Sequence, residues 1–145
     1  MENDRMGFSR DLKVLVDTNI LLYVYDGLDP FNKVLEFLDY KPSFFIHSTV
    51  LRELDILFEK NKKGFIISSR IKIARKYLEV YKNLWNLIND YDDLPTDEAL
   101  IRTALKHNMF IFTNDKELKN DAIKKGIGVL FLQNRSKIIK SLYPI

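Results

Sequence analysis

The amino-acid sequence predicts an α/β protein with a mostly parallel sheet and helices packed on its faces. Two observations lead to this prediction. In the last third of the chain, short apolar runs alternate with helical stretches, which is the order of elements that builds parallel sheets. The first run, residues 12–16, is rich in valine and ends abruptly in polar residues, as is typical of a buried strand that leads into a helix.

The first third of the chain carries clear turn and helix signals. After the first strand, residues 19–25 continue apolar and stop at Asp26-Gly27, a pair that favours a turn. Pro30 suits the first turn of a helix, and the apolar residues after it keep helical spacing until Pro42. We therefore expect a helix between the first two strands.

The middle of the chain is predicted to be mainly helical. Residues 44–47 form a second short strand, and Ser48 is the expected N-cap of a helix that runs to about residue 61. Gly64 separates this helix from residues 65–89, a periodic stretch without proline or glycine. We expect this stretch to form one long helix or two closely spaced ones.

The last third alternates between helices and strands. Thr96 can cap a helix over residues 97–107, and a strand over residues 109–113 follows it. A helix over residues 114–125 and a strand over residues 128–132 complete the predicted elements.

The composition excludes several kinds of site. Of the 145 residues, 46% are hydrophobic and 30% charged, as is typical of folded globular proteins. No repeat or linker divides the chain, so we expect a single domain over residues 1–145. The absence of cysteine excludes disulfides, thiolate zinc sites and cysteine nucleophiles. The N-terminus lacks a signal-peptide pattern and no apolar run is long enough to cross a bilayer, so we expect a cytoplasmic protein without a membrane partner.

Two acidic residues follow predicted strands. Asp17 comes directly after the first strand, and Asp115 follows the strand that ends at Thr113. In open α/β sheets the ligand crevice lies beyond the carboxyl ends of the strands, so both residues are candidates for chemistry. The alternative is that each one only caps the next helix, where a carboxylate accepts free backbone N–H groups and suits the helix dipole.

Asp97 and Glu98 lie in the same predicted helical turn but on different faces. Asp97 shares its stripe with the apolar residues at i+3, i+4 and i+7, which predicts that it lies on the core-facing side. Glu98 has Arg102 at i+4, a spacing typical of an exposed ion pair. Only Asp97 therefore calls for a functional explanation.

Glu53 lies on the apolar stripe of its predicted helix, with Val50, Leu54 and Leu57. A buried carboxylate is costly unless it is protonated, paired with a lysine or arginine, or bound to metal. Asp17 and Asp115 follow strands, and Glu53 and Asp97 lie on core-facing stripes. One cation shared by all four carboxylates explains these positions better than four separate causes. Mg²⁺ or Mn²⁺ would offset their repulsion, polarise a phosphoryl oxygen and orient water for attack.

Basic residues concentrate between Lys60 and Lys82, a stretch in which Glu79 is the only acidic residue. This cluster and the net charge of +3 suit a polyanionic partner. We expect a basic quartet in this stretch to contact the phosphates of such a partner: Arg70, Lys72, Arg75 and Lys76. The alternative is a solvated helix face that contacts nothing.

The two histidines are weaker candidates for chemistry. His47 ends a predicted strand and His107 ends a predicted helix, so they are too far apart in sequence to form a local ligand motif. The five glycines are scattered and form no phosphate-binding loop.

With these features in place, the sequence resembles PIN domains over nearly its whole length. The resemblance rests on Val16-Asp17-Thr18-Asn19-Ile20, Glu53 about one helix later, Asp97 seven residues before Ala104, Thr113-Asn114-Asp115 after a strand, and Gly126-Ile127-Gly128-Val129 before a final strand. It implies a three-layer α/β/α PIN-like fold with a central, mostly parallel sheet. It also implies a ribonuclease that depends on Mg²⁺ or Mn²⁺.

The resemblance further implies roles for residues and partners. Catalytic and metal-ligating roles fall to Asp17, Glu53, Asp97 and Asp115, and supporting roles to Thr18, Asn19, Thr113 and Asn114. The end of the sequence is similar to the branch that processes ribosomal RNA precursors, and nearly as similar to VapC-type toxins, which cut RNA and are silenced by an antitoxin. The expected partners are RNA, a second copy in a homodimer, and either an antitoxin or a ribosome-assembly partner.

Three other functions are less well supported. A catalytically silent RNA-binding or assembly module is disfavoured by the four intact acids. A phosphatase of another α/β family would need a second aspartate two residues after its nucleophile, where this chain has Asn19. A DNA nuclease with the same acidic core would need further elements to clamp duplex DNA, for which a chain of this length has little room.

Overall fold

The computed structural model describes residues 12–38, 40–133 and 138–142. Within these residues, one six-stranded sheet has the order β3-β2-β1-β4-β5-β6. Its strands are β1 (Lys13–Val16), β2 (Ser43–His47), β3 (Trp85–Ile88), β4 (Phe110–Phe112), β5 (Val129–Gln133) and β6 (Ile138–Leu142). Neighbouring strands are parallel except β5 and β6, which are antiparallel. The predicted, mostly parallel sheet is therefore confirmed.

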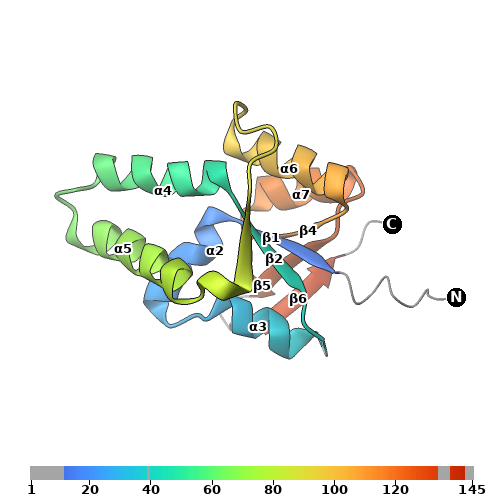
Figure 1. Cartoon of the computed structure of the whole chain (residues 1–145), viewed down its shortest axis with the longest axis horizontal. Helices are drawn as coiled ribbons and strands as arrows, with labels where there is room; N and C mark the ends of the chain where they lie inside the picture. The colour runs from blue at the N-terminus through green and yellow to red at the C-terminus, as the bar shows by residue number, and fades with distance from the viewer. Residues whose placement is uncertain (1–11, 39, 134–137, 143–145) are drawn as a thin grey trace, which may run out of the picture.

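Helices cover both faces of the sheet. They are α2 (Thr18–Leu22), α3 (Pro30–Phe37), α4 (Ser48–Lys60), α5 (Phe65–Val80), α6 (Thr96–His107) and α7 (Lys116–Lys124), with two 3-10 helices, η1 (Tyr23–Asp26) and η2 (Lys82–Leu84). Figure 1 shows α6 and α7 on one side of the sheet, α3 on the other, and α4 beside α5. This confirms the predicted α/β/α layers. In the described residues, no helix is long and apolar enough to span a membrane.

The central strand β1 explains its own sequence. It pairs with β2 on one side and with β4 on the other, and Val14, Leu15 and Val16 are fully buried. A strand covered by helices on both faces has no solvated side, so its residues are apolar without alternation.

Two helices begin differently from the prediction. Ser48 is the first residue of α4 rather than its cap, because the imidazole of His47 occupies the cap position and its Nδ1 accepts the Thr49 N–H at 3.0 Å. Thr96 is likewise the first residue of α6, and it follows Pro95, which offers no side-chain acceptor. Because Ser, Thr, Asp and Asn are the usual cap residues, the cap preferences of single amino acids could not predict His47 or Pro95 at these positions.

The prediction of helix over residues 65–89 holds for α5 and is wrong for β3. Residues 85–88 form an edge strand that pairs only with β2, and Leu87 on it is 58% exposed. The Trp85 indole donates to the Leu78 carbonyl of α5 at 2.9 Å, which holds the strand against the helix. A strand of four residues is too short to show a clear pattern of alternating apolar residues. The strand conformation of β3 therefore depends on its backbone hydrogen bonds to β2.

The strand predicted at residues 128–132 corresponds to β5 but is not the last one, since β6 returns antiparallel beside it. Gly126 ends α7 with a φ of 84°, a left-handed conformation that favours glycine. At Gly128, an added Cβ would lie 2.5 Å from the Phe110 ring, so only glycine fits beside β4.

Candidate active site

The centre of the sheet contains a topological switch point between β1 and β4. The chain leaves β1 toward β2 and leaves β4 toward β5, which lie on opposite sides. In open α/β sheets, ligands bind in the crevice beyond the strand ends at such a point. Asp17 directly follows β1, and Asp115 follows β4 by three residues. The two strand-end acids of the sequence prediction therefore lie at this crevice.

Asp17 is held by hydrogen bonds from both sides. Its side chain is almost completely buried, with 5% of the residue exposed. Oδ1 accepts the backbone N–H of Thr18 at 2.7 Å, and Oδ2 accepts the hydroxyl of Thr113 at 2.7 Å. The carboxylate thus has a fixed orientation at the end of β1.

Threonine hydroxyls extend this contact to two more acids. Thr18 Oγ1 donates to Glu53 Oε1 at 2.6 Å, and Thr113 Oγ1 accepts the backbone N–H of Asp115 at 3.0 Å. A continuous hydrogen-bonded chain therefore runs from the Glu53 carboxylate through Thr18, Asp17 and Thr113 to the backbone N–H of Asp115. We call it the acidic chain. It brings together α4, β1, the loop after β4 and the start of α7.

Asp115 also caps a helix, which is the alternative role that its position after a strand suggested. Its Oδ1 accepts the Leu118 N–H at 3.0 Å, at the start of α7. The neighbouring Asn114 fixes the loop to β5, since its amide donates to the Leu132 carbonyl at 3.1 Å and accepts the Leu132 N–H at 2.7 Å. Asn19 reaches the same loop, with its Oδ1 3.4 Å from the Asn114 nitrogen.

Asp97 differs from the sequence expectation. The apolar members of its stripe, Leu100, Ile101 and Ala104, are buried as predicted, but Asp97 itself is exposed in the first turn of α6. Its position at the end of the helix, rather than within it, keeps it in contact with solvent. Its pKa is nevertheless raised, first by partial desolvation and then by the charges of other acids, among them Asp115 and Glu53.

Two further acids near this site were missed by the sequence reasoning. Glu117 and Asp121 on α7 also raise the pKa of Asp97 through their charges. Their i, i+4 spacing, which puts both on one face of α7, was the available signal. Asp121 is paired with Lys125 at 2.6 Å. Glu98, in contrast, forms the predicted exposed pair with Arg102 at 3.0 Å.

Burial and repulsion act together on Asp17. Desolvation is the largest effect and raises its pKa to about 6, with smaller contributions from the charges of Asp97 and Glu53. Hydrogen bonds from Thr113 and Thr18 oppose this rise without cancelling it. Among the described residues, no lysine, arginine or histidine forms an ion pair with any of the four predicted acids. The alternative in which a basic side chain compensates Glu53 is therefore not what the structure shows.

The chemistry of this donor set fits a hard divalent cation. Oxygen ligands in a partly buried, negatively charged crevice are what Mg²⁺ and Mn²⁺ prefer. As they stand, no three acidic or histidine side chains of the described part of the chain are grouped closely enough to hold an ion. A cation held by all four predicted acids would therefore require rearrangement of their side chains.

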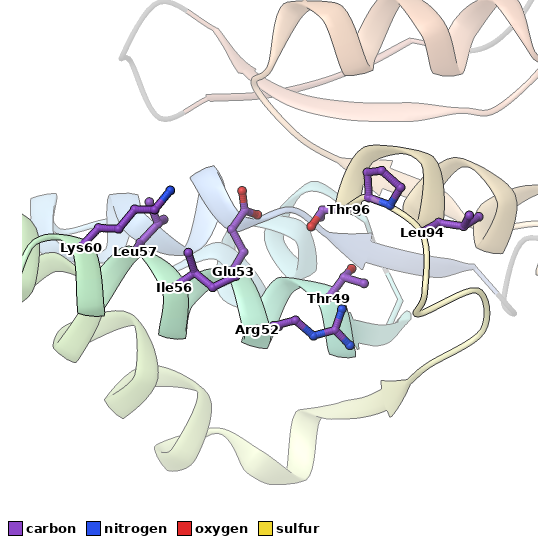
Figure 2. A pocket seen from close by; sticks show the side chains of 9 residues that line it. Thr49, Arg52, Glu53, Ile56, Leu57, Lys60, Leu94 and Thr96 are labelled. Atoms are coloured by element: carbon purple, nitrogen blue, oxygen red, sulfur yellow. The ribbon is translucent and has the colours of Figure 1, made fainter.

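A groove of about 350 Å³ adjoins the acidic chain at Glu53. One wall is a stripe of α4 formed by Thr49, Arg52, Glu53, Ile56, Leu57 and Lys60. Leu94, Pro95 and Thr96 form the opposite wall at one end (Figure 2). We call this the α4 groove. It gives the site a partly apolar extension with a carboxylate and two cations along one helix.

Both histidines lie against Asp90, in the loop that leads into α6. His47 Nδ1 accepts a backbone N–H, so Nε2 carries the proton and donates to the Asp90 carbonyl at 2.6 Å. His107 Nε2 and Lys106 Nζ lie 2.6 and 3.2 Å from Asp90 Oδ2 and hold the pKa of that carboxyl below its usual range. The histidines, distant in sequence, therefore fix the loop that positions Asp97.

Three members of the basic quartet are already paired within the chain. Arg70 contacts Asp26 at 2.6 Å, Arg75 contacts Asp55, and Lys76 contacts Glu79 at 3.4 Å. The fourth, Lys72, is exposed and lies 6.0 Å from the centre of the Phe58 ring. RNA contact by the quartet stays a prediction, and it would have to compete with these pairs.

The sequence of this chain matches a family model and two known ribonucleases. Residues 14–135 match the family model described as PIN like domain. The chain is 31% identical to Ribonuclease VapC9 of Archaeoglobus fulgidus, over 98% of each chain, and 28% identical to Ribonuclease VapC4 of Methanocaldococcus jannaschii, over 85% of this chain and 92% of that one.

Two solved structures are similar in fold. The PIN domain endonuclease Utp24 matches with a TM-score of 0.68 at 23% identity, over 92% of this chain and 94% of that one. VapBC2 from Rickettsia felis, bound to a DNA fragment from its promoter, matches with a TM-score of 0.53 at 23% identity, over 75% of this chain and 92% of that one.

Proposed function

This chain belongs to the PIN-like domain family, and from that premise we propose that it is a metal-dependent ribonuclease that hydrolyses RNA phosphodiester bonds. The observation that carries the proposal is the acidic chain at the switch point, which orients the carboxylates of Glu53 and Asp17 and reaches the backbone of Asp115. Among the residues that the structure describes, none of these three acids has a basic partner. Two relatives that are named as ribonucleases match over most of the chain, which supports the same activity.

The residues divide the work as follows. Asp17, Glu53, Asp97 and Asp115 would hold Mg²⁺ or Mn²⁺. When bound, such a cation polarises a phosphoryl oxygen and favours attack by water. Thr18 and Thr113 orient the carboxylates of Glu53 and Asp17, so that these two groups need little rearrangement. Asp97 is exposed, which leaves it accessible from the substrate side.

The test compares two glutamine substitutions on α4. Glu53→Gln removes one charge from the acidic chain but keeps an oxygen that can accept the Thr18 hydroxyl. Glu59→Gln removes one charge from an exposed residue that is paired with Lys62 at 3.0 Å, and it serves as the matched control. With labelled RNA and Mn²⁺, we expect Glu53→Gln to lose about 100-fold or more in cleavage rate and the control to keep its rate.

Chelation gives the second arm of this test. EDTA should abolish cleavage by the unsubstituted protein, and added Mn²⁺ or Mg²⁺ should restore it. Cleavage that persists in EDTA would refute the metal-dependent mechanism. RNA binding without cleavage under all metal conditions would favour the catalytically silent RNA-binding module.

Two biological roles are compatible with this activity. Processing of ribosomal RNA precursors is the role suggested first by the end of the sequence. A VapC-type toxin, paired with an antitoxin, is supported by the 31% identity to Ribonuclease VapC9 over nearly the whole chain. Expression of the chain alone should arrest growth if it is a toxin, and a small neighbouring reading frame should relieve the arrest. Accumulated rRNA precursors after deletion of the gene would favour the processing role.

A homodimer is part of the same proposal. Three apolar side chains at the start of α5 are exposed: Phe65 by 79%, Ile66 by 58% and Ile67 by 46%. Apolar side chains grouped on a surface are typical of a contact with another protein. Light scattering during size-exclusion chromatography would show a dimer mass, and Phe65→Ser should reduce it to that of a monomer.

A further inference from the structure

Lys60 is the cation in the α4 groove that the fold leaves available. Arg52, the other one, donates to the Asp92 carbonyl at 3.0 Å and so helps to hold the loop before α6. Lys60 is exposed, and within the described residues its side-chain amine has no hydrogen bond or ion pair. Three members of the basic quartet, by contrast, already have carboxylate partners.

Lys60 also has a defined spatial relation to the acidic chain. It lies seven residues after Glu53 on the same wall of the groove, which corresponds to two helical turns or roughly 10 Å along α4. Between them lie Ile56, which is 47% exposed, and Leu57. Figure 2 shows the Glu53 carboxylate and the Lys60 amine at successive positions along the helix.

From this order of groups we propose that the α4 groove binds the unpaired nucleotide next to the scissile phosphate of an RNA strand. Lys60 contacts the phosphate of that nucleotide, and Ile56 and Leu57 contact its base or sugar. The inference rests on the proposed ribonuclease function, and it adds which surface and which side chains bind the nucleotide next to the scissile phosphate. Glu53 belongs both to the groove and to the acidic chain, so a strand in the groove lies next to this acid.

The size and polarity of the groove support this occupant. About 350 Å³ is near the lower limit of small-molecule pockets and suits one nucleotide rather than a helix of paired bases. Unpaired bases bind proteins through their faces, which Ile56 and Leu57 can cover, whereas bases in a duplex are stacked on their neighbours. Lys60 follows the apolar side chains of Ile56 and Leu57 along α4. This order of groups matches the alternation of base and phosphate along an RNA strand.

The test measures RNA affinity in an Asp17→Asn background, so that the RNA survives. The probes are a fluorescent 12-nucleotide RNA, single-stranded or annealed to its complement, and anisotropy is recorded across a salt series. We expect Lys60→Gln to weaken binding of the single strand about three- to fivefold at low salt. The log–log salt slope should fall by about 0.7, the value for one lost phosphate contact. Thermal melting confirms that the variant is folded.

Two further variants make the result specific. Lys63→Gln removes the same charge from an exposed lysine just beyond α4 and outside the groove, and it should change binding less. Ile56→Asn should weaken binding of the single strand without changing the salt slope. Equal effects of Lys60→Gln and Lys63→Gln, or tighter binding of the duplex than of the single strand, would overturn the proposal. An acidic peptide of a protein partner would then be the better occupant.

Cleavage by the unsubstituted protein separates this inference from the proposed function. Cleavage of the single strand with no effect of Lys60→Gln on affinity refutes the groove alone. A Lys60 effect on affinity without cleavage in Mn²⁺ refutes the ribonuclease proposal and leaves a binding groove. Neither binding nor cleavage refutes both.

Discussion

The substitution Asp17→Asn tests the physical basis of the site most directly. In the folded protein without metal, the pKa of Asp17 lies at about 6, compared with its ordinary value of 3.8. That difference corresponds to roughly 3 kcal/mol, an upper limit for the cost of keeping this buried carboxylate charged. Asparagine cannot ionise and therefore does not carry this cost.

The sign of the effect depends on pH. Because the folded state binds the Asp17 proton more tightly than the unfolded state, the free energy of unfolding is highest below about pH 4 and falls as the pH rises to about 6. The variant lacks this fall. Asparagine keeps only one acceptor oxygen, so the variant loses one of the two hydrogen bonds that Asp17 accepts from Thr18 and Thr113, which costs about 1 kcal/mol. In EDTA, we expect Asp17→Asn to be less stable than the unsubstituted protein at pH 4 and about 1–2 kcal/mol more stable at pH 8.

Urea unfolding at both pH values, with and without Mn²⁺, measures whether the order of the two stabilities reverses between pH 4 and pH 8. We call this reversal the crossing. Mn²⁺ should stabilise the unsubstituted protein and have a much smaller effect on the variant, which should also lose Mn²⁺-dependent RNA cleavage. Asp93→Asn, on an exposed carboxylate of the loop before α6, is the control and should show no crossing. A variant that is equally destabilised at both pH values, or that cleaves RNA at the full rate, would refute the reasoning.

Three further predictions follow from the same structure. Asp97→Asn should cost far more activity than Glu98→Gln, because only Asp97 faces the other acids; equal losses in a cleavage assay would contradict this. Replacing the basic quartet with glutamine should weaken RNA binding and flatten the log–log salt slope by on the order of 0.7 per lost contact. An unchanged slope would show that these side chains stay in their ion pairs within the protein and do not contact RNA. Asp90→Asn should lower the melting temperature at pH 7, and the loss should become smaller as the pH falls below 3.8, because a carboxyl with a lowered pKa contributes stability at neutral pH and loses it on acidification; equal melting temperatures at pH 7 would argue against this role.

Local signals in the sequence were sufficient for β1, β2, β4 and β5 and for the acids that follow β1 and β4. The valine-rich run of β1 predicts a doubly covered strand, and the polar residues after it place Asp17 at the crevice. Spacing alone also separates Asp97 from Glu98, because an i, i+4 pair with Arg102 is a property of a single helix. Such features are readable because neighbouring residues decide them.

The tertiary structure decided whatever depends on segments that are distant in sequence. Residues 85–88 form β3 only because β2 offers its edge, and His47 becomes a helix cap only because β2 ends where α4 begins. The exposure of Asp97 at the mouth of the site and the availability of Lys60 in the α4 groove depend on which elements pack nearby. The sequence by itself therefore determined that Asp17 and Asp115 follow strands and that Asp97 and Glu98 lie on different faces of α6. The packing of the chain decided that Glu117 and Asp121 lie near Asp97, and that Arg70 and Arg75 are paired with acids, because contacts between residues distant in sequence exist only once the chain has folded.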